Sequence, residues 1–165
     1  MCKESAVRAA LTAAQEHCAL CPRRCGAARR ETAGLCGMGA ELKVARAALH
    51  YWEEPCISGC DGSGTVFFSG CTLRCVFCQN REISAGGFGQ AISVERLREV
   101  FRELEAAGAS NINLVSPTQF APWIALALEE VPGIPVVWNT GGYERVETLR
   151  LLEGKVQIYL PDLKY

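Results

Sequence analysis

The sequence predicts an α/β fold in which parallel strands alternate with helices, as in part of a (β/α) barrel. Three observations predict it. They are four short apolar segments typical of strands, helix-patterned segments between them, and a change near residue 60 from a Cys-rich, turn-rich pattern to this alternation. Strands that alternate with helices run parallel and are joined by right-handed crossovers. We expect about four β/α units, fewer than the eight of a closed barrel, and therefore a partial barrel that is incomplete at its C-terminus.

The elements of this predicted partial barrel, residues 61–165, follow one another at regular spacing. Continuous apolar runs predict strands at residues 65–69, 111–115, 135–138 and 156–160. Apolar residues at helical period predict helices at residues 94–107, 122–130 and 143–152. Ser93 directly precedes the first of these helices and is a favourable N-cap residue.

The region before the barrel has a different character. Residues 1–17 predict an N-terminal amphipathic helix, rich in alanine. Residues 18–60 form a Cys-rich N-terminal module with a connecting segment, in which residues 42–51 are apolar but ambiguous between strand and helix. Glycines and a proline among the cysteines favour a small metal-binding knuckle over an independent hydrophobic unit.

Composition excludes several classes of function. The 17 basic and 18 acidic side chains give a net charge of −1, so we expect no nucleic-acid partner. No apolar stretch approaches the roughly 20 residues of a membrane span, and the first residues lack the apolar run of a signal peptide, so we expect no membrane association. Ten cysteines without an export signal favour metal binding in a reducing compartment, hence a cytoplasmic protein.

The most informative cysteines follow the first predicted barrel strand, in the order Cys71-x3-Cys75-x2-Cys78. Thiolates separated by two or three residues can converge on one metal centre. Three thiolates can hold three irons of a [4Fe–4S] cubane and leave the fourth iron open to a substrate group. The alternative is zinc, which is disfavoured because zinc sites take a fourth protein ligand or keep a catalytic water.

Residues 70–80, Gly-Cys-Thr-Leu-Arg-Cys-Val-Phe-Cys-Gln-Asn, resemble the signature of the radical SAM superfamily. The wider chain resembles the branch related to pyruvate formate-lyase activating enzyme, the PflX-like proteins. The shared features are Glu-Glu-Pro at 53–55, Gly-Ser-Gly at 62–64 and Leu-Pro-Asp-Leu-Lys-Tyr at 160–165.

The resemblance implies a chemistry. The open iron of the [4Fe–4S] cluster would bind S-adenosyl-L-methionine (SAM), and one electron would cleave SAM to a 5′-deoxyadenosyl radical that takes hydrogen from a protein or small-molecule substrate. It also implies a low-potential electron donor of the flavodoxin or ferredoxin type, and a glycyl radical protein or peptide as a candidate substrate. No catalytic residue beyond the cluster ligands is assigned.

The resemblance also implies further SAM contacts. Phe77 would place its backbone against adenine, and Ser116, Asn139, Thr140 and Asp162 would line the carboxyl ends of the strands. Here a Ser-Pro-Thr segment at 116–118 replaces a glycine-rich motif of many relatives. The alternative is that these polar groups merely cap strand ends, and that Phe77 packs within its loop.

A second set of cysteines, Cys18, Cys21, Cys25 and Cys36, precedes the barrel. Four thiolates would satisfy tetrahedral zinc or saturate an auxiliary iron–sulfur cluster; the alternative is reduced, unliganded thiols. We expect the arginine pairs at 23–24 and 29–30 to offset the thiolate charge and to lower the pKa values of these cysteines.

Two functions from different classes remain open at this point. The first is a radical SAM enzyme of the activating-enzyme type, an oxidoreductase. The second is a non-catalytic iron–sulfur or zinc protein that carries electrons or scaffolds a partner. We expect the chain to be a fragment or an unusually short form. A third alternative is therefore a fragment that binds iron but does not turn over SAM.

Overall fold

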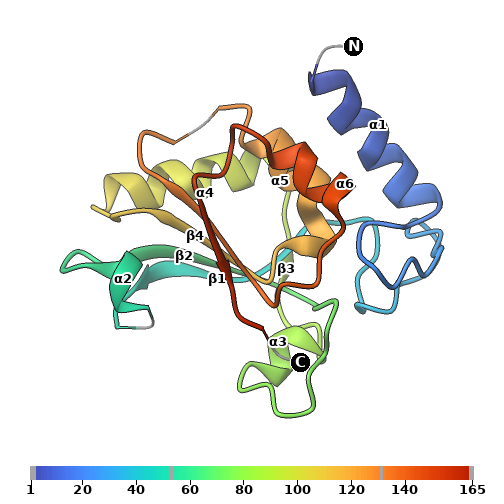
Figure 1. Ribbon diagram of the computed structural model, residues 1–165, viewed down its shortest axis with the longest axis horizontal. Coiled ribbons are helices and arrows are strands. Elements are labelled where there is room, and N and C mark those ends of the chain that lie inside the picture. Colours follow the sequence, from blue (N-terminus) through green and yellow to red (C-terminus); the bar gives the residue numbers. More distant parts are fainter. Residues whose placement is uncertain (1–2, 53, 131, 164–165) are drawn as a thin grey trace.

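A computed structural model describes residues 3–52, 54–130 and 132–163, and shows one twisted sheet whose longer helices lie on one side (Figure 1). The strand order across the sheet is β3-β1-β2-β4-β5-β6. The strands are β1 (Lys43–His50), β2 (Ser63–Phe68), β3 (Gln90–Ala91), β4 (Ile112–Val115), β5 (Val136–Thr140) and β6 (Ile158–Pro161).

The four strands predicted for the barrel region are neighbours in the sheet and run parallel. β2 pairs with β4, β4 with β5, and β5 with β6, so that Val66, Leu114, Trp138 and Tyr159 lie in one row across the sheet. The prediction of an α/β fold with parallel strands is therefore confirmed as a mostly parallel six-stranded sheet. Because the strands are parallel, the loops that follow them all leave from the same edge.

The two remaining strands are antiparallel. β1 comes from the ambiguous segment at 42–51 and pairs antiparallel with β2, while β3 pairs antiparallel with β1. Residues 43–50, which the sequence placed in the connecting segment, thus extend the same sheet as the parallel strands. The boundary predicted near residue 60 falls just before β2.

Helices were predicted well where the periodicity was strong. They are α1 (Lys3–Glu16), α2 (Pro55–Ser58), α3 (Arg81–Ser84), α4 (Val94–Ala106), α5 (Ala121–Ala127) and α6 (Val146–Leu149), with 3₁₀ turns η1 (Thr118–Phe120) and η2 (Arg150–Leu152). Ser93 caps α4 as predicted, because its hydroxyl oxygen accepts a hydrogen bond from the Arg96 amide at 3.1 Å.

The helix predicted at 143–152 is shorter than expected. Its α-helical part begins only at Val146 and continues as a 3₁₀ turn. Arg145 has extended backbone angles and precedes the helix. Glu144 is engaged through its side chain with the end of β5, which holds the chain in a non-helical path there.

The core lies between the sheet and the helices above it. Val66, Phe68, Leu114 and Trp138 are fully buried in one cluster with residues of α4 and α5. Successive residues of a strand point to opposite faces, so Thr65, Asn113 and Val137 form a row on the other face. That row is also buried but partly polar.

α1 packs against α5 in a second layer, away from the sheet (Figure 1). Within the described ranges, no helix combines the length and the apolar character needed to cross a bilayer.

Candidate functional site

The loop that follows β2 carries Cys71, Cys75 and Cys78 at the edge where parallel strands end. All three side chains are half-buried. The Ser84 hydroxyl of α3 donates a hydrogen bond to the Cys78 sulfur at 3.3 Å. The loop begins at Gly70, whose φ of +75° is favourable only for glycine; a Cβ there would also meet Met38 and approach the Cys36 carbonyl oxygen to 2.7 Å.

The start of this loop is hydrogen-bonded to the turn after β4. Gln119 is 2% exposed, and its side-chain amide donates to the carbonyl oxygens of Ser69 at 3.0 Å, Gly70 at 3.1 Å and Ser116 at 2.7 Å. One buried side chain therefore ties the cysteine loop to the end of the neighbouring strand. Sequence reasoning missed Gln119, because nothing local in the sequence indicates a contact 50 residues away.

The Cys-rich segment holds the same loop from the other side. The Arg23 guanidinium donates to the carbonyl oxygens of Thr72 at 2.5 Å and Leu73 at 3.2 Å. The Cys71 amide donates to the Cys36 carbonyl oxygen at 3.3 Å. The backbone that carries the first of the three thiols is thus fixed by partners distant in the sequence.

The tip of the cysteine loop is strongly exposed. Val76 is 90% exposed and Phe77 is 70% exposed, although both are apolar. Phe77 is therefore not packed within its loop, which was one of the two alternatives. The prediction that its backbone lies against adenine stays a prediction.

The polar residues predicted at the strand ends lie along this same edge. The Ser116 amide donates to the Asn139 carbonyl oxygen at 2.9 Å, and the Asp162 amide donates to the Thr140 carbonyl oxygen at 2.7 Å. Ser116 has φ +52°, a left-handed conformation that is uncommon for residues other than glycine and clusters at functional sites.

Gly141 joins the cysteine loop to the ends of β5 and β6. A Cβ at Gly141 would collide with the Leu73 side chain and would lie 3.9 Å from the Asp162 carbonyl oxygen. The cysteine loop therefore packs directly over the strand ends that carry the other predicted site residues.

Glu144 is a residue of this edge that the sequence did not reveal. One carboxylate oxygen, Oε1, accepts a hydrogen bond from the Thr118 hydroxyl at 2.6 Å and another from the Thr140 hydroxyl. A carboxylate is thus oriented between the ends of β4 and β5. Its only signal in the sequence is a position shortly after Asn139 and Thr140.

The residues present fit a [4Fe–4S] cluster by their chemistry. Three thiols in one loop can supply the three thiolates that such a cluster needs. In the described part of the chain, however, no three Cys, His, Asp or Glu side chains stand in an arrangement that could hold a metal ion. The thiols must therefore turn toward one another to bind the cluster.

The second set of cysteines lies in the segment that contacts this loop through Arg23 and Cys36. Cys18 and Cys36 are buried, whereas Cys21 and Cys25 are half-buried. The sulfurs of Cys25 and Cys36 lie 3.3 and 3.6 Å from the position that a Cβ on Gly34 would occupy. These two sulfurs therefore flank one small residue.

The expectation that the arginine pairs lower all these thiol pKa values is wrong. Burial raises the pKa values of Cys21 and Cys36. Burial also opposes ionisation of Cys25, but backbone N–H donors and the Arg29 guanidinium outweigh it and lower the pKa of that thiol. Arg23 instead donates to the cysteine loop, and Arg30 donates to the Gln15 side chain at 2.7 Å.

Comparison with known proteins identifies the family. The sequence profile of the Radical SAM superfamily matches residues 65–161, which span β2 to β6 and include the cysteine loop. The chain belongs to the radical SAM superfamily. Membership implies a [4Fe–4S] cluster and SAM as cofactors. The loop after β2, residues 70–80, is called the radical SAM motif below because its sequence resembles the signature of this family.

One curated relative of this radical SAM chain is the uncharacterized protein MJ0674 of Methanocaldococcus jannaschii. The two are 32% identical over 160 residues, which cover 91% of this chain and 46% of the relative. The chain thus spans about half the length of that protein. No solved structure matches the chain.

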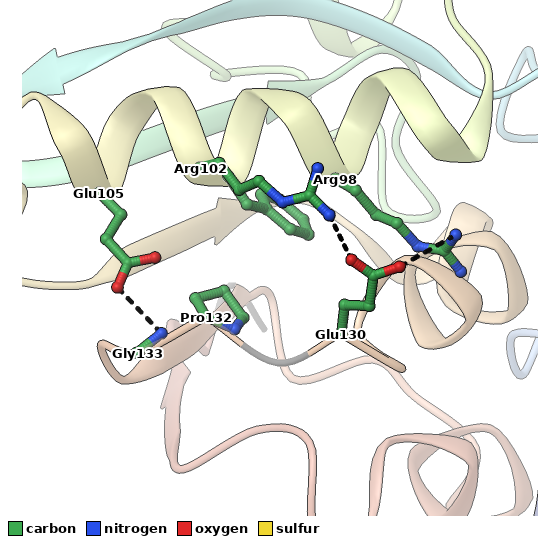
Figure 2. Close-up of a pocket in the computed structure, with 7 residues that line it drawn as sticks. Arg98, Arg102, Glu105, Glu130, Pro132 and Gly133 are labelled. Atoms are coloured by element: carbon green, nitrogen blue, oxygen red, sulfur yellow. Dashed lines mark hydrogen bonds and ion pairs between the residues drawn. The ribbon is translucent and has the colours of Figure 1, made fainter.

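A surface pocket lies away from the radical SAM motif, between α4 and the segment that follows α5 (Figure 2). Glu130 is paired with Arg102 and lies 3.8 Å from Arg98. Glu105 accepts a hydrogen bond from the Gly133 amide at 3.0 Å. The polar groups of this pocket therefore bind one another. They form an ion-paired contact between α4 and the segment after α5, and we do not assign a catalytic role to it.

Proposed function

We propose that this radical SAM chain holds a [4Fe–4S] cluster on Cys71, Cys75 and Cys78 and cleaves SAM reductively. When bound, the cluster would supply the electron that cleaves SAM to methionine and a 5′-deoxyadenosyl radical, for hydrogen abstraction from a protein or small-molecule substrate. The proposed enzyme resembles the activases of glycyl radical enzymes, and its parallel strands form part of a (β/α) barrel.

The observation that carries the proposal is the position of the three thiols. They occupy the loop after β2, and Leu73 of that loop packs on Gly141 at the end of β5. In parallel α/β sheets, ligands bind outside the carboxyl ends of the strands. SAM bound to a cluster in this loop would therefore lie over those strand ends.

We propose that Glu144 accepts a hydrogen bond from the amino group of SAM's methionine part. Thr118 and Thr140 both donate to Oε1 of its carboxylate, so the group is oriented before SAM arrives. A preorganised carboxylate forms a charge-assisted hydrogen bond with an amino group, because the acceptor is ionised. Ser116, Asn139, Asp162 and the Phe77 backbone complete the proposed SAM site.

The proposed electron donor is a low-potential protein of the flavodoxin or ferredoxin type. Val76 and Phe77 project from the radical SAM motif into solvent, which supports a docking contact close to the cluster. A reduced cluster and free thiols also suit a cytoplasmic location. The proposed substrate class includes a glycyl radical protein or peptide.

Anaerobic reconstitution with iron and sulfide tests the proposal. The native chain should gain about four irons and, with dithionite and SAM, release 5′-deoxyadenosine. Cys71→Ala, Cys75→Ala and Cys78→Ala should each lose iron and product. Cys56→Ala and Cys60→Ala, at exposed thiols outside the loop, are the matched controls and should retain both.

The same preparations separate the enzyme from a non-catalytic iron–sulfur or zinc protein. SAM bound at the open iron should change the EPR spectrum of the reduced cluster. An unchanged spectrum, or 5′-deoxyadenosine release that persists in the three alanine variants, would show that the assignment of this loop is wrong.

A further inference from the structure

We propose that Cys18, Cys21, Cys25 and Cys36 bind one zinc ion as a closed four-thiolate site, and that this ion orders the segment which braces the radical SAM motif. The zinc site stands independently of SAM chemistry. Its bracing role rests on the proposed use of the loop that carries Cys71, Cys75 and Cys78.

The first observation is that backbone amides surround these sulfurs. In three cases the amide two residues later faces the sulfur: Arg23 at Cys21, Ala27 at Cys25 and Met38 at Cys36. The Leu35 amide also faces the Cys25 sulfur. Donor groups placed in this way suit the negative charge of a metal-bound thiolate.

The second observation is the closeness of the sulfurs around Gly34. A Cβ on this residue would come within 3.3 Å of the Cys25 sulfur and 3.6 Å of the Cys36 sulfur. In the described part of the chain no three Cys, His, Asp or Glu side chains already stand in a metal-binding arrangement, so the sulfurs have to converge by rotation about their Cα–Cβ bonds. The absence of a side chain at Gly34 leaves room for this rotation. We propose zinc because four thiolates close a tetrahedral zinc site.

The third observation is an uncompensated buried cation beside the thiols. Arg29 is 2% exposed, and its guanidinium lies over the rings of Phe120 and Trp123, 5.4 and 4.8 Å from their centroids. It donates to the carbonyl oxygens of Gly39 at 2.8 Å and Gln119 at 2.7 Å, but Nη2 has no hydrogen-bond partner. No ion pair recorded between described residues includes Arg29.

A buried cation is costly unless a negative charge lies nearby. The charge of Arg29 acts on the thiols of Cys25 and Cys36. A zinc ion with four thiolates carries a net negative charge, because four ligand charges exceed the two charges of the ion. Zinc binding would therefore supply the counter-charge that the described structure otherwise lacks at Arg29.

The segment has no regular secondary structure to hold its shape. Residues 18–42 contain no helix or strand, and their buried side chains, among them Leu20 and Met38, pack into the main core. A small module without a core of its own can draw part of its folding free energy from a structural metal. The segment is also docked on the start of α6, because Arg145 donates to the Ala19 carbonyl oxygen and Thr148 to that of Leu20, each at 2.6 Å.

The same segment carries the contacts that hold the radical SAM motif. Cys36 accepts from the Cys71 amide through its own carbonyl oxygen, and Arg23 lies within the tight turn between Cys21 and Cys25. A metal bound to Cys21 would hold Arg23 in place, whose side chain donates to the cysteine loop. A metal bound to Cys36 would hold the carbonyl oxygen that accepts from the Cys71 amide. We expect zinc to order the start of the cluster loop before any iron is bound.

Metal analysis tests the site without iron. The variant with Cys71, Cys75 and Cys78 all changed to alanine, purified in the presence of zinc, should retain about one zinc per chain. Adding Cys25→Ser and Cys36→Ser should reduce zinc at least about tenfold. Adding Cys56→Ser and Cys60→Ser instead is the matched control and should leave zinc unchanged.

Cobalt(II) provides a readout that does not depend on the stability of the serine variants. Bound in place of zinc in the triple alanine variant, it should show the intense visible bands of a tetrahedral thiolate site. A metal-free triple variant with all four thiols open to a thiol reagent would overturn the zinc site. Iron retained there in place of zinc would also overturn it, in favour of an auxiliary cluster.

Hydrogen exchange tests the bracing role. Removing zinc from the triple variant with a chelator should accelerate exchange at amides 70–73 by about tenfold or more, while amides of β4 remain protected. Unchanged exchange at amides 70–73 would overturn the bracing role and leave the zinc site standing. Neither measurement involves SAM, so failure here is distinguishable from failure of the proposed enzyme.

Discussion

Replacing Glu144 with glutamine removes a charge while it keeps the shape of the side chain. The Oε1 atom that accepts from Thr118 and Thr140 becomes an amide oxygen, which can accept the same two bonds. The local structure should therefore persist. What the variant lacks is the negative charge that we propose for binding the amino group of SAM.

The size of the effect follows from the charge-assisted hydrogen bond. Hydrogen bonds to charged groups contribute about 1.5–3 kcal/mol, and each 1.4 kcal/mol corresponds to tenfold in affinity. Glu144 is half-buried, so solvent screens part of this interaction. We therefore expect the lower part of that range, a rise of about 10- to 30-fold in the Kd of SAM.

Equilibrium SAM binding to the reconstituted chain measures this Kd, with iron content and circular dichroism confirming that cluster and fold are intact. Glu147→Gln is the matched control, because Glu147 is exposed in α6 and pairs with Arg145 at 3.3 Å. It should leave the Kd within about twofold of the native value. An equally small change in Glu144→Gln, with iron content intact, would refute the role of this carboxylate.

Two further substitutions test how the fold positions the site. Gln119→Leu removes a buried donor to three carbonyl oxygens. The free energy of unfolding in urea should therefore fall by about 1–3 kcal/mol, and iron retention should fall with it. Native stability in this variant would contradict the role of Gln119 in linking Gly70 to Ser116. Ser93→Ala removes the cap of α4 and should cost about 1 kcal/mol in the same assay without loss of iron, whereas Ser93→Asp should retain the stability.

The sequence was most informative where burial leaves a continuous pattern. β2 and the parallel strands beside it are largely buried, so their apolar runs stand out. The position of Cys71 at the ligand-binding edge then follows from the parallel topology alone. β1 remained ambiguous because its residues are half-buried or exposed throughout, and only its pairing with β2 identifies it as a strand.

The site was less predictable where it depends on contacts between distant residues. Thr118 and Glu144 are 26 residues apart, and Gln119 lies 50 residues from Ser69. No local period or motif encodes such pairs. The arginines were equally hard to place from the sequence. Composition predicts positive charge near the thiols. Only the fold shows that Arg29 acts on these thiols, whereas Arg23 donates to carbonyl oxygens of the cysteine loop.

The docking of the Cys-rich segment on α6 has a consequence for the order of events during synthesis. Ala19 and Leu20 are bonded by side chains 126 and 128 residues further along the chain. At about 5–20 residues per second, the first thiols leave the ribosome on the order of ten seconds before that docking surface exists. During this interval nothing downstream shields them, so we expect an ion captured on the nascent chain to protect them from oxidation until the sheet is complete.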